Sequence, residues 1–287
     1  METIKITIMG AGGFLGTKLV KILSEHHEVY PFYHGKEPKV DITQIQDIQK
    51  IIDVKPNIVI HAAGMTNVDL CETYKELAEK VNVAPMHSIV EACNKTKAKL
   101  VYFSTDFIFD GEKGMYKEDD TPNPLGYYAL TKLKAENILK EKSDDYLILR
   151  VVVLYGYNGD NSERSYVNWV VNSLSQGKEI KTYTDQYGTP TLTDDIADAV
   201  NLLTKNDCKG VYHVAGAQRL TRYDMAIKIA EEFNLNKCLI KPILMKDLNL
   251  PAKRPKDSSL SIEKLKKQGI LMHTFEEGIK IMRHQTK

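Results

Sequence analysis

The stretch ITIMGAGGFLG, residues 6–16, decides the fold because it joins a short apolar run to three evenly spaced glycines. Gly10, Gly13 and Gly16 stand three residues apart, and a segment with helical spacing of leucines follows. Such glycines allow a tight turn, let backbone N–H groups approach a pyrophosphate, and let the helix pack close to the strand. A phosphate would then lie at the positive end of that helix, beside Phe14 and Leu15. The stretch therefore predicts a dinucleotide-binding strand–turn–helix.

The rest of the first half alternates between apolar strands and amphipathic helices. We predict strands at 28–33, 57–63, 99–105 and 146–156, and helices at 14–27, 42–54, 74–96 and 126–142. This alternation is typical of a parallel sheet that is covered by helices on both faces. The predicted fold class is therefore α/β: a Rossmann-type, doubly wound parallel sheet with a smaller C-terminal substrate-binding lobe.

After residue 156 the alternation becomes less regular. We expect a turn and a helix over 183–204, one more strand over 210–216, a helix over 219–235 and a polar surface lobe over 246–269. The predicted dinucleotide-binding domain covers 1–156, with 183–216 returning to it. The predicted substrate-binding lobe covers 157–182 and 217–287.

Composition excludes several classes of protein. The 287 residues carry a formal net charge of +1 without a basic block, so we expect no nucleic-acid and no membrane partner. We find no apolar segment long enough for a signal sequence or a membrane span. The four cysteines are scattered without metal-ligand spacing, so we expect reduced thiols in a cytoplasmic protein and predict no metal site.

The end of the second predicted strand bears on the choice of cofactor. An acidic residue there would bind the ribose hydroxyls of NAD, but the sequence has Tyr33, His34 and Lys36. His34 or Lys36 could attract a 2′-phosphate, so we predict NADP(H), with NAD(H) as the alternative. Asp41 and Ile42 follow and are candidates for the edge of the adenine site, although Asp41 could simply mark the start of a helix.

Small and polar residues end the next two strands. The sequence HAAG, 61–64, places Ala62, Ala63 and Gly64 where a flat cofactor could lie over the backbone. The sequence FSTDFIFDG, 103–111, ends its strand with Ser104 and Thr105. In a doubly wound sheet ligands bind outside the carboxyl ends of the strands, so we expect these residues to line the site.

A helical pair follows in GYYALTKLKAENIL, 126–139. Tyr128 and Lys132 are four residues apart and lie on one face of the predicted helix. By itself this is a weak pattern, since a packed tyrosine beside a solvated lysine is common. Because the helix follows the loop after Thr105, both side chains can point into one cleft, and this favours a chemical role.

Several longer motifs carry a resemblance to a known family. These are HAAGMTNVDLCE (61–72), STDFIFDG (104–111), NPLGYYALTKLKAE (123–136), TDQYGTPT (184–191), GVYHVAG (210–216) and RPKDSSL (254–260). With them the chain resembles the extended short-chain dehydrogenase/reductases and, within that group, the dTDP-4-dehydrorhamnose reductases. The resemblance covers essentially the whole chain.

The resemblance implies reduction of the 4-keto group of a nucleotide-linked 6-deoxy sugar, the cofactor hydride passing to the ketone carbon. Tyr128 would donate a proton to the developing alkoxide, and Lys132 would favour the phenolate and lower the pKa of Tyr128. Thr105 would hydrogen-bond the carbonyl oxygen. Asp106 would bind the sugar, and Arg254 would either meet the nucleotide diphosphate or remain a solvated arginine.

Two departures from the family pattern concern the sugar pocket. Phe107 stands where the family usually has tyrosine, and Val151-Val152-Val153 replaces a Thr-Ser-Trp that usually follows the arginine at 150. Val153 therefore takes the place of the tryptophan that lines the sugar site. The identity of the sugar is left open by these differences, whereas the cofactor half of the pattern is intact.

Other functions share part of this pattern. A sugar-nucleotide dehydratase would carry a glutamate where this chain has Phe107. A sugar-nucleotide 4-epimerase stays open, although the missing NAD-type acid argues against it. A non-catalytic, NADP-binding regulatory subunit, similar to the beta subunit of methionine adenosyltransferase, also stays open, since VVLYG (152–156) matches that protein as well as the reductases. A homodimer is compatible with the sequence.

Overall fold

The computed structural model describes residues 3–159 and 165–286. Its centre is a six-stranded sheet in the order β10-β5-β4-β3-β1-β2, in which all neighbouring strands run parallel. In chain order these strands are β1 (Lys5–Met9), β2 (Glu28–Phe32), β3 (Ile58–His61), β4 (Lys99–Thr105), β5 (Tyr146–Val151) and β10 (Gly210–His213). The α/β, Rossmann-type prediction is confirmed.

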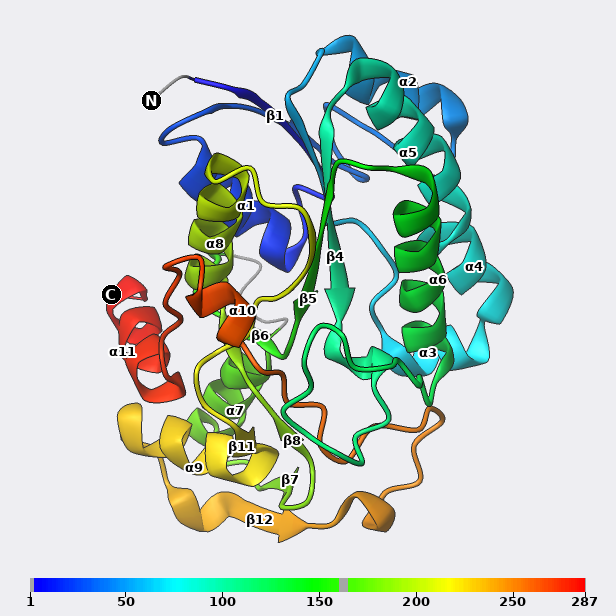
Figure 1. Ribbon diagram of the computed structural model, residues 1–287. Coiled ribbons are helices and arrows are strands. Elements are labelled where there is room, and N and C mark those ends of the chain that lie inside the picture. The colour runs from blue at the N-terminus through cyan, green and yellow to red at the C-terminus, as the bar shows by residue number, and fades with distance from the viewer. Residues whose placement is uncertain (1–2, 160–164, 287) are drawn as a thin grey trace.

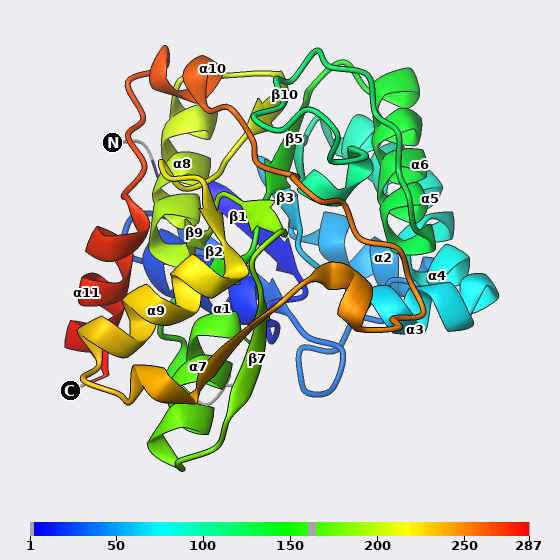
Figure 2. The same ribbon diagram turned by 90° about the horizontal axis from the view of Figure 1, so that it is seen from below.

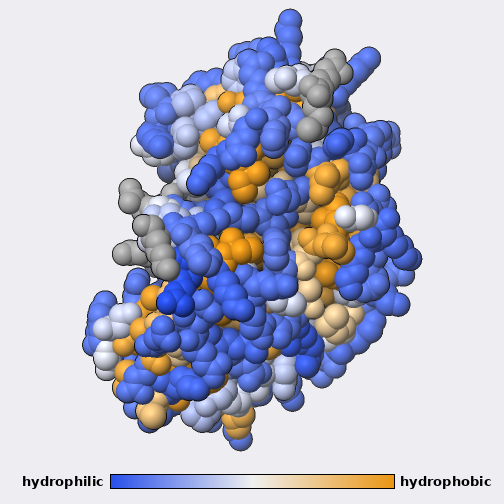
Figure 3. Space-filling view, turned by 90° about the vertical axis from the view of Figure 1, so that its left-hand side faces the viewer, coloured by the Kyte–Doolittle hydropathy of each residue, from blue (hydrophilic) through white to orange (hydrophobic). Residues whose placement is uncertain are grey.

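Helices cover both faces of this sheet (Figure 1). One face packs against α1 (Phe14–Leu23), α8 (Thr193–Lys205) and the short α10 (Glu263–Lys266), and the other against α2 (Ile45–Asp53), α5 (Ala84–Thr96) and α6 (Tyr127–Lys142). All seven residues of β4 are buried, as expected for a central strand between two helical layers. Seen from the side of α8, α10 and α11 (Phe275–Gln285), the surface is mostly hydrophilic, with smaller apolar patches (Figure 3).

A smaller unit lies beyond the carboxyl ends of the strands and has its own apolar core. Its helices are α7 (Tyr166–Ser175), α9 (Arg222–Glu232) and α11. It also contains two pairs of short strands: β7 (Ile180–Tyr183) pairs with β12 (Ile240–Ile243), and β8 (Tyr187–Gly188) pairs with β11 (Leu220–Thr221). Two further short strands, β6 (Leu154–Tyr155) and β9 (Thr191–Leu192), pair between the units. The single-turn helices are η1 (Asp106–Ile108), η3 (Lys237–Leu239) and η4 (Met245–Asp247).

The segment that follows β12 crosses the molecule. In Figure 2 it runs from the smaller unit to α3 (Val68–Thr73), which precedes α4 (Lys75–Asn82). There the Arg254 guanidinium binds the Asp69 carboxylate, with distances of 3.1 and 2.7 Å. The expectation of a polar surface lobe over 246–269 is wrong for 258–262, which are buried.

Two element predictions needed correction. The helix expected over 74–96 is two helices, α4 and α5, and Pro85 stands in the first turn of α5, where a missing N–H costs nothing. The strand expected over 146–156 is broken between β5 and β6. At this break Val153 has a φ of 38°, which is rare for a β-branched residue, so the chain turns sharply there.

Candidate active site

The loop between β1 and α1 requires its glycines. A Cβ on Gly10, whose φ is 81°, would lie 2.6 Å from the Ala63 backbone nitrogen, and a Cβ on Gly16 would lie 2.1 Å from the Gly10 oxygen. Gly13 is the N-cap residue of α1, and having no side chain it makes no side-chain hydrogen bond to the first turn of the helix. Gly13, Phe14 and Leu15 line a cavity at this end of α1, and the positive end of a helix beside a cavity fits the diphosphate of a dinucleotide.

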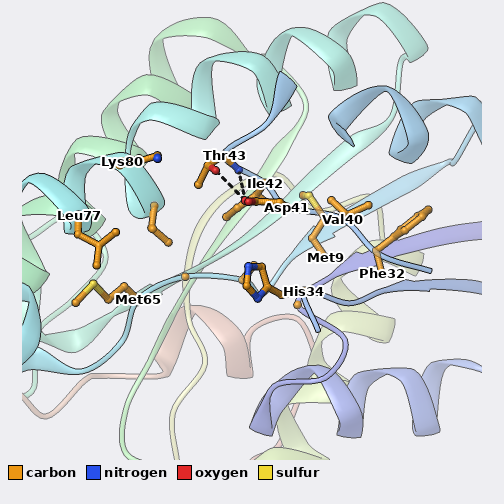
Figure 4. A pocket seen from close by; sticks show the side chains of 14 residues that line it. Met9, Phe32, His34, Val40, Asp41, Ile42, Thr43, Met65, Leu77 and Lys80 are labelled. Carbon is orange, nitrogen blue, oxygen red and sulfur yellow. Dashed lines mark hydrogen bonds between the residues drawn. The ribbon is translucent and has the colours of Figure 1, made fainter. Parts of the chain in front are cut away.

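A cavity of about 510 Å³ lies beside this loop (Figure 4). Its lining includes Gly10, Phe32, His34, Asp41 and Ile42. The Asp41 carboxylate accepts hydrogen bonds from the backbone N–H of Thr43 at 2.9 Å and from its hydroxyl at 2.8 Å, and these bonds lower the pKa of Asp41. Asp41 is thus engaged by its own turn, at the edge of a mostly apolar pocket of a shape suited to a nucleobase.

The adjoining cavity, on the other side of the loop, contains no carboxylate among its described lining residues. Tyr33, His34 and Lys36 line it together with Gly10–Gly13. Lys36 Nζ lies 4.3 Å from the centre of the Tyr33 ring. The two basic residues at the end of β2 therefore stand where a ribose 2′-substituent would lie, and they favour a phosphate over a hydroxyl.

A third cavity brings most of the predicted site residues together. The predicted residues that line it are Gly13, Phe14, Leu15, Ala62, Ala63, Gly64, Thr105, Asp106, Tyr128, Lys132 and Val153. Gly10, Tyr33, Asp41 and Ile42 line the two neighbouring cavities, and Gly16 packs behind the glycine turn. Arg254 is not among the residues that line the third cavity, because its guanidinium is bound to Asp69.

Tyr128 and Lys132 are placed by the first two turns of α6. Burial raises the pKa of Tyr128, and a hydrogen bond with the Thr105 hydroxyl opposes this rise. Burial lowers the pKa of Lys132 to about 7, and its Nζ lies 4.1 Å from the centre of the Tyr102 ring. The expected lowering of the Tyr128 pKa by Lys132 is not found, because burial favours the neutral form of both groups.

Residues behind α6 hold this pair in place. The Asn82 amide donates to the Thr131 hydroxyl at 3.0 Å. One turn after Lys132, the Glu136 carboxylate binds the Arg150 guanidinium at 3.0 and 2.8 Å, both side chains being buried. Arg150 lowers the pKa of Glu136 to about 2, against the effect of burial. The buried ion pair therefore ties α6 to β5 beneath the site.

Asp106 joins the two units of the molecule. Its carboxylate accepts a hydrogen bond from the Thr105 hydroxyl at 3.0 Å and another from the Ser258 hydroxyl. Burial raises the pKa of Asp106 to about 6. The carboxylate is therefore poised between its charged and neutral forms near physiological pH, beside the hydroxyl predicted to contact the substrate.

Three residues at this site were not predicted from the sequence. Arg222 and Tyr166 line the cavity from the smaller unit, and Ser258 contacts Asp106 from the crossing segment. The sequence shows Thr221 and Asp224 as a capping box for α9, which is the structure found, but this pattern does not say where the Arg222 side chain points.

Other kinds of site are not found in the described part of the chain. Across 3–159 and 165–286, the structure has no group of three or more His, Cys, Asp or Glu side chains that could hold a metal ion. In the same residues no helix is long and apolar enough to cross a membrane.

The parallel sheet, the glycine loop and the Tyr128–Lys132 pair together define the class of extended short-chain dehydrogenase/reductases. Within this class the particular family follows from comparison: residues 4–287 match the family model described as the RmlD substrate binding domain, and the chain belongs to this family. The resemblance to dTDP-4-dehydrorhamnose reductases is thereby confirmed.

Individual relatives carry two kinds of name. The probable low-salt glycan biosynthesis reductase Agl14 of Haloferax volcanii is 33% identical, with 95% of each chain covered. Methionine adenosyltransferase 2 subunit beta of Bos taurus is 30% identical, with 96% of this chain and 86% of that protein covered. The crystal structure of dTDP-4-dehydrorhamnose reductase from Bacillus anthracis in complex with NADP has a TM-score of 0.91 and 31% identity, and the match covers 99% of this chain and 100% of that chain.

Proposed function

We propose that the protein is an NAD(P)H-dependent reductase of the 4-keto group of a nucleotide-linked 6-deoxy sugar, of the type that converts dTDP-4-dehydrorhamnose to dTDP-rhamnose. One observation carries this proposal: Thr105, Tyr128 and Lys132 line the same cavity, and Gly13 of the glycine loop lines it too. The names of the relatives support it, since both the Haloferax volcanii protein and the Bacillus anthracis protein are called reductases.

The cofactor is NADP(H), with NAD(H) as the alternative, and when bound it supplies the hydride. Gly10, Gly13 and the first N–H groups of α1 hold its diphosphate. The backbone of 62–64 supports the nicotinamide end, and His34 and Lys36 attract the 2′-phosphate. The structure of the Bacillus anthracis relative in complex with NADP supports this choice.

The proton comes from Tyr128. Its raised pKa keeps the phenol protonated, so it can donate to the ketone oxygen as negative charge develops there. The Thr105 hydroxyl donates a second hydrogen bond to that oxygen, in exchange for its present bond to Asp106. Asp106 is then free to accept a hydrogen bond from a sugar hydroxyl. Lys132 orients the cofactor ribose and stabilises the phenolate that Tyr128 becomes after it donates its proton.

The test is NADPH oxidation, followed by absorbance, with dTDP-4-keto-6-deoxyglucose or its rhamnose-configured epimer. We expect Tyr128→Phe to lower kcat by about 10²- to 10⁴-fold, the usual contribution of a general acid. The matched control is Tyr127→Phe, because the Tyr127 hydroxyl binds Glu79 at 2.9 Å outside the cavity. Equal loss in both variants, or none in either, would refute the assignment of Tyr128.

A second function is favoured by two observations. Methionine adenosyltransferase 2 subunit beta is about as similar to this chain as the reductases are, and Val153 leaves the sugar site without its usual aromatic wall. A non-catalytic, NADP-binding regulatory subunit would bind NADPH tightly and oxidise none of it with any 4-keto sugar. A 4-epimerase would instead interconvert sugars without net NADPH consumption.

Several further assignments belong to the same proposal. We place the protein in the cytoplasm, with a nucleotide sugar as its partner and a homodimer as its assembly. The dinucleotide-binding domain is 1–156 together with 183–216, and the substrate-binding lobe is 157–182 together with 217–287. Arg254 and Val153 are assigned to the substrate, Arg254 at the nucleotide diphosphate once the bond to Asp69 opens.

A further inference from the structure

Arg222 enters the candidate active site from the smaller unit. It is the first residue of α9, and its backbone is fixed on both sides: its N–H donates to the Gln186 oxygen at 3.1 Å, and its carbonyl accepts from the Tyr166 hydroxyl at 2.8 Å. Its guanidinium lies 5.2 Å from the centre of the Tyr166 ring. It lines the same cavity as Thr105 and Tyr128.

The guanidinium of Arg222 has no partner of opposite charge among the residues that the structure describes. Within 3–159 and 165–286, no carboxylate lies within ion-pair distance of it, and its side chain donates no hydrogen bond. The neighbouring charged groups are already engaged: Arg254 binds Asp69 through two contacts, and Asp106 binds Thr105 and Ser258. Among the described residues, Arg222 and Lys132 are therefore the two cations of this cavity whose side chains donate no hydrogen bond, and Arg222 is the one that lies on the smaller unit.

An unpaired cation in such a place is costly. Burial lowers the pKa of Arg222, and the neighbouring Tyr166 and Asp106 side chains only partly oppose this effect. Arg222 is half-buried, and a guanidinium that is partly withdrawn from water normally has carboxylate or phosphate oxygens as acceptors for its planar set of donors. Since the described residues supply none, the acceptor that fits is one that arrives with the substrate.

We propose that Arg222 is a substrate-binding residue whose guanidinium holds an anionic oxygen group of the substrate, on the far side of the sugar from Tyr128. This inference rests on the proposed function, because it takes the ligand to be a nucleotide-linked sugar. The anionic group has two sources: the diphosphate that links sugar and nucleoside, or a carboxylate carried by the sugar. Both present oxygens that a guanidinium can bind through two parallel hydrogen bonds.

The experiment measures ligand binding to the NADPH-loaded protein by calorimetry, so it does not depend on turnover. The ligands are dTDP, dTDP-glucose and dTDP-glucuronate. The variants are Arg222→Met and Arg222→Lys, and the control is Arg219→Met, because Arg219 binds Asp257 at 2.6 Å and is not among the residues of the cavity. NADPH affinity and thermal unfolding are measured for every variant. NADPH affinity should not change, and Arg222→Met should unfold at the same temperature as the wild type or a higher one, since the contacts that fix the backbone at residue 222 do not use its side chain and the variant removes an unpaired charge.

We expect Arg222→Met to weaken binding by about tenfold to a hundredfold, as for the loss of one or two charge-assisted hydrogen bonds, and Arg219→Met to leave it unchanged. Arg222→Lys should recover part of the affinity. Equal weakening of all three ligands assigns the diphosphate, and weakening of dTDP-glucuronate alone assigns a carboxylate.

The inference is overturned if Arg222→Met binds all three ligands as the wild type does, or if the wild type binds none of them. Failure of the proposed function looks different. In that case the ligands bind with an affinity that depends on Arg222, while no 4-keto sugar is reduced.

Discussion

Replacing Lys132 by methionine should abolish reduction and yet stabilise the protein at low pH. The lysine is 7% exposed, and burial lowers its pKa from 10.5 to about 7. Below pH 7 the folded protein therefore holds a desolvated charge that the unfolded chain keeps in water. Methionine has a similar length and no charge, so the Lys132→Met variant avoids this cost.

The size of the effect follows from linkage. Between about pH 7 and pH 10.5 the unfolded chain binds the proton at Lys132 and the folded protein does not, so the stability of the wild type rises with pH. Each pH unit in this window contributes about 1.4 kcal/mol. Because half of the folded Lys132 is already deprotonated at pH 7, the wild type should gain about 2 kcal/mol relative to Lys132→Met from pH 7 to pH 9, which is roughly 4–8 °C in Tm for a chain of this size.

The assay is thermal and urea unfolding of the cofactor-free protein at pH 6, 7.5 and 9. The matched control is Lys134→Met on the same helix, because Lys134 is 42% exposed at its side chain and pairs with Glu79. Its difference from the wild type should not vary over this pH range. A stability difference between wild type and Lys132→Met that is independent of pH would refute the reasoning, since it would mean that Lys132 keeps its ordinary pKa.

Two further changes test the scaffold of the site. Gly16→Ala should weaken NADPH binding by about tenfold or more, because the new Cβ would lie 2.1 Å from the Gly10 oxygen and displace the loop. A calorimetric affinity equal to that of the wild type would contradict this. Arg150→Met should cost about 3–5 kcal/mol in urea unfolding, because it leaves the buried Glu136 carboxylate with Lys140 alone at 2.9 Å. The control is Lys140→Met, which removes the more exposed partner of the Glu136 carboxylate and should cost less than about 1 kcal/mol of unfolding free energy. If Lys140→Met destabilised the protein more than Arg150→Met, the buried Arg150–Glu136 pair would not anchor α6.

Local rules were sufficient for much of the fold and the cofactor site. Strand periodicity and the three glycines of residues 6–16 predict β1, α1 and the order of the first elements, since each depends on neighbouring residues. The four-residue spacing of Tyr128 and Lys132, on a helix that follows β4, was enough to place both in one cavity with Thr105. Such inferences succeed because a doubly wound sheet brings the carboxyl ends of its strands to one edge.

Contacts between distant segments could not be predicted in this way. The ion pair between Asp69 and Arg254 joins residues 185 apart in the sequence, and it engages an arginine for which the sequence offered either the nucleotide diphosphate or solvent. Arg222 was missed because helical periodicity over 219–235 predicts that a helix forms there and not which way the side chain of its first residue points. The break between α4 and α5 depends on where the chain bends at Pro85, which periodicity alone does not show.

Hydride transfer to the sugar is the central claim, and isotope labelling tests it most directly. The protein is incubated with NADPH that carries deuterium at the transferable C4 position and with dTDP-4-keto-6-deoxy sugar, and the product is examined by mass spectrometry and NMR. The account predicts deuterium at C4 of the reduced sugar with the wild type and with Tyr127→Phe, at a rate that Tyr128→Phe lowers by about 10²- to 10⁴-fold. A wild-type protein that binds the labelled NADPH and leaves the sugar unreduced and unlabelled would contradict it.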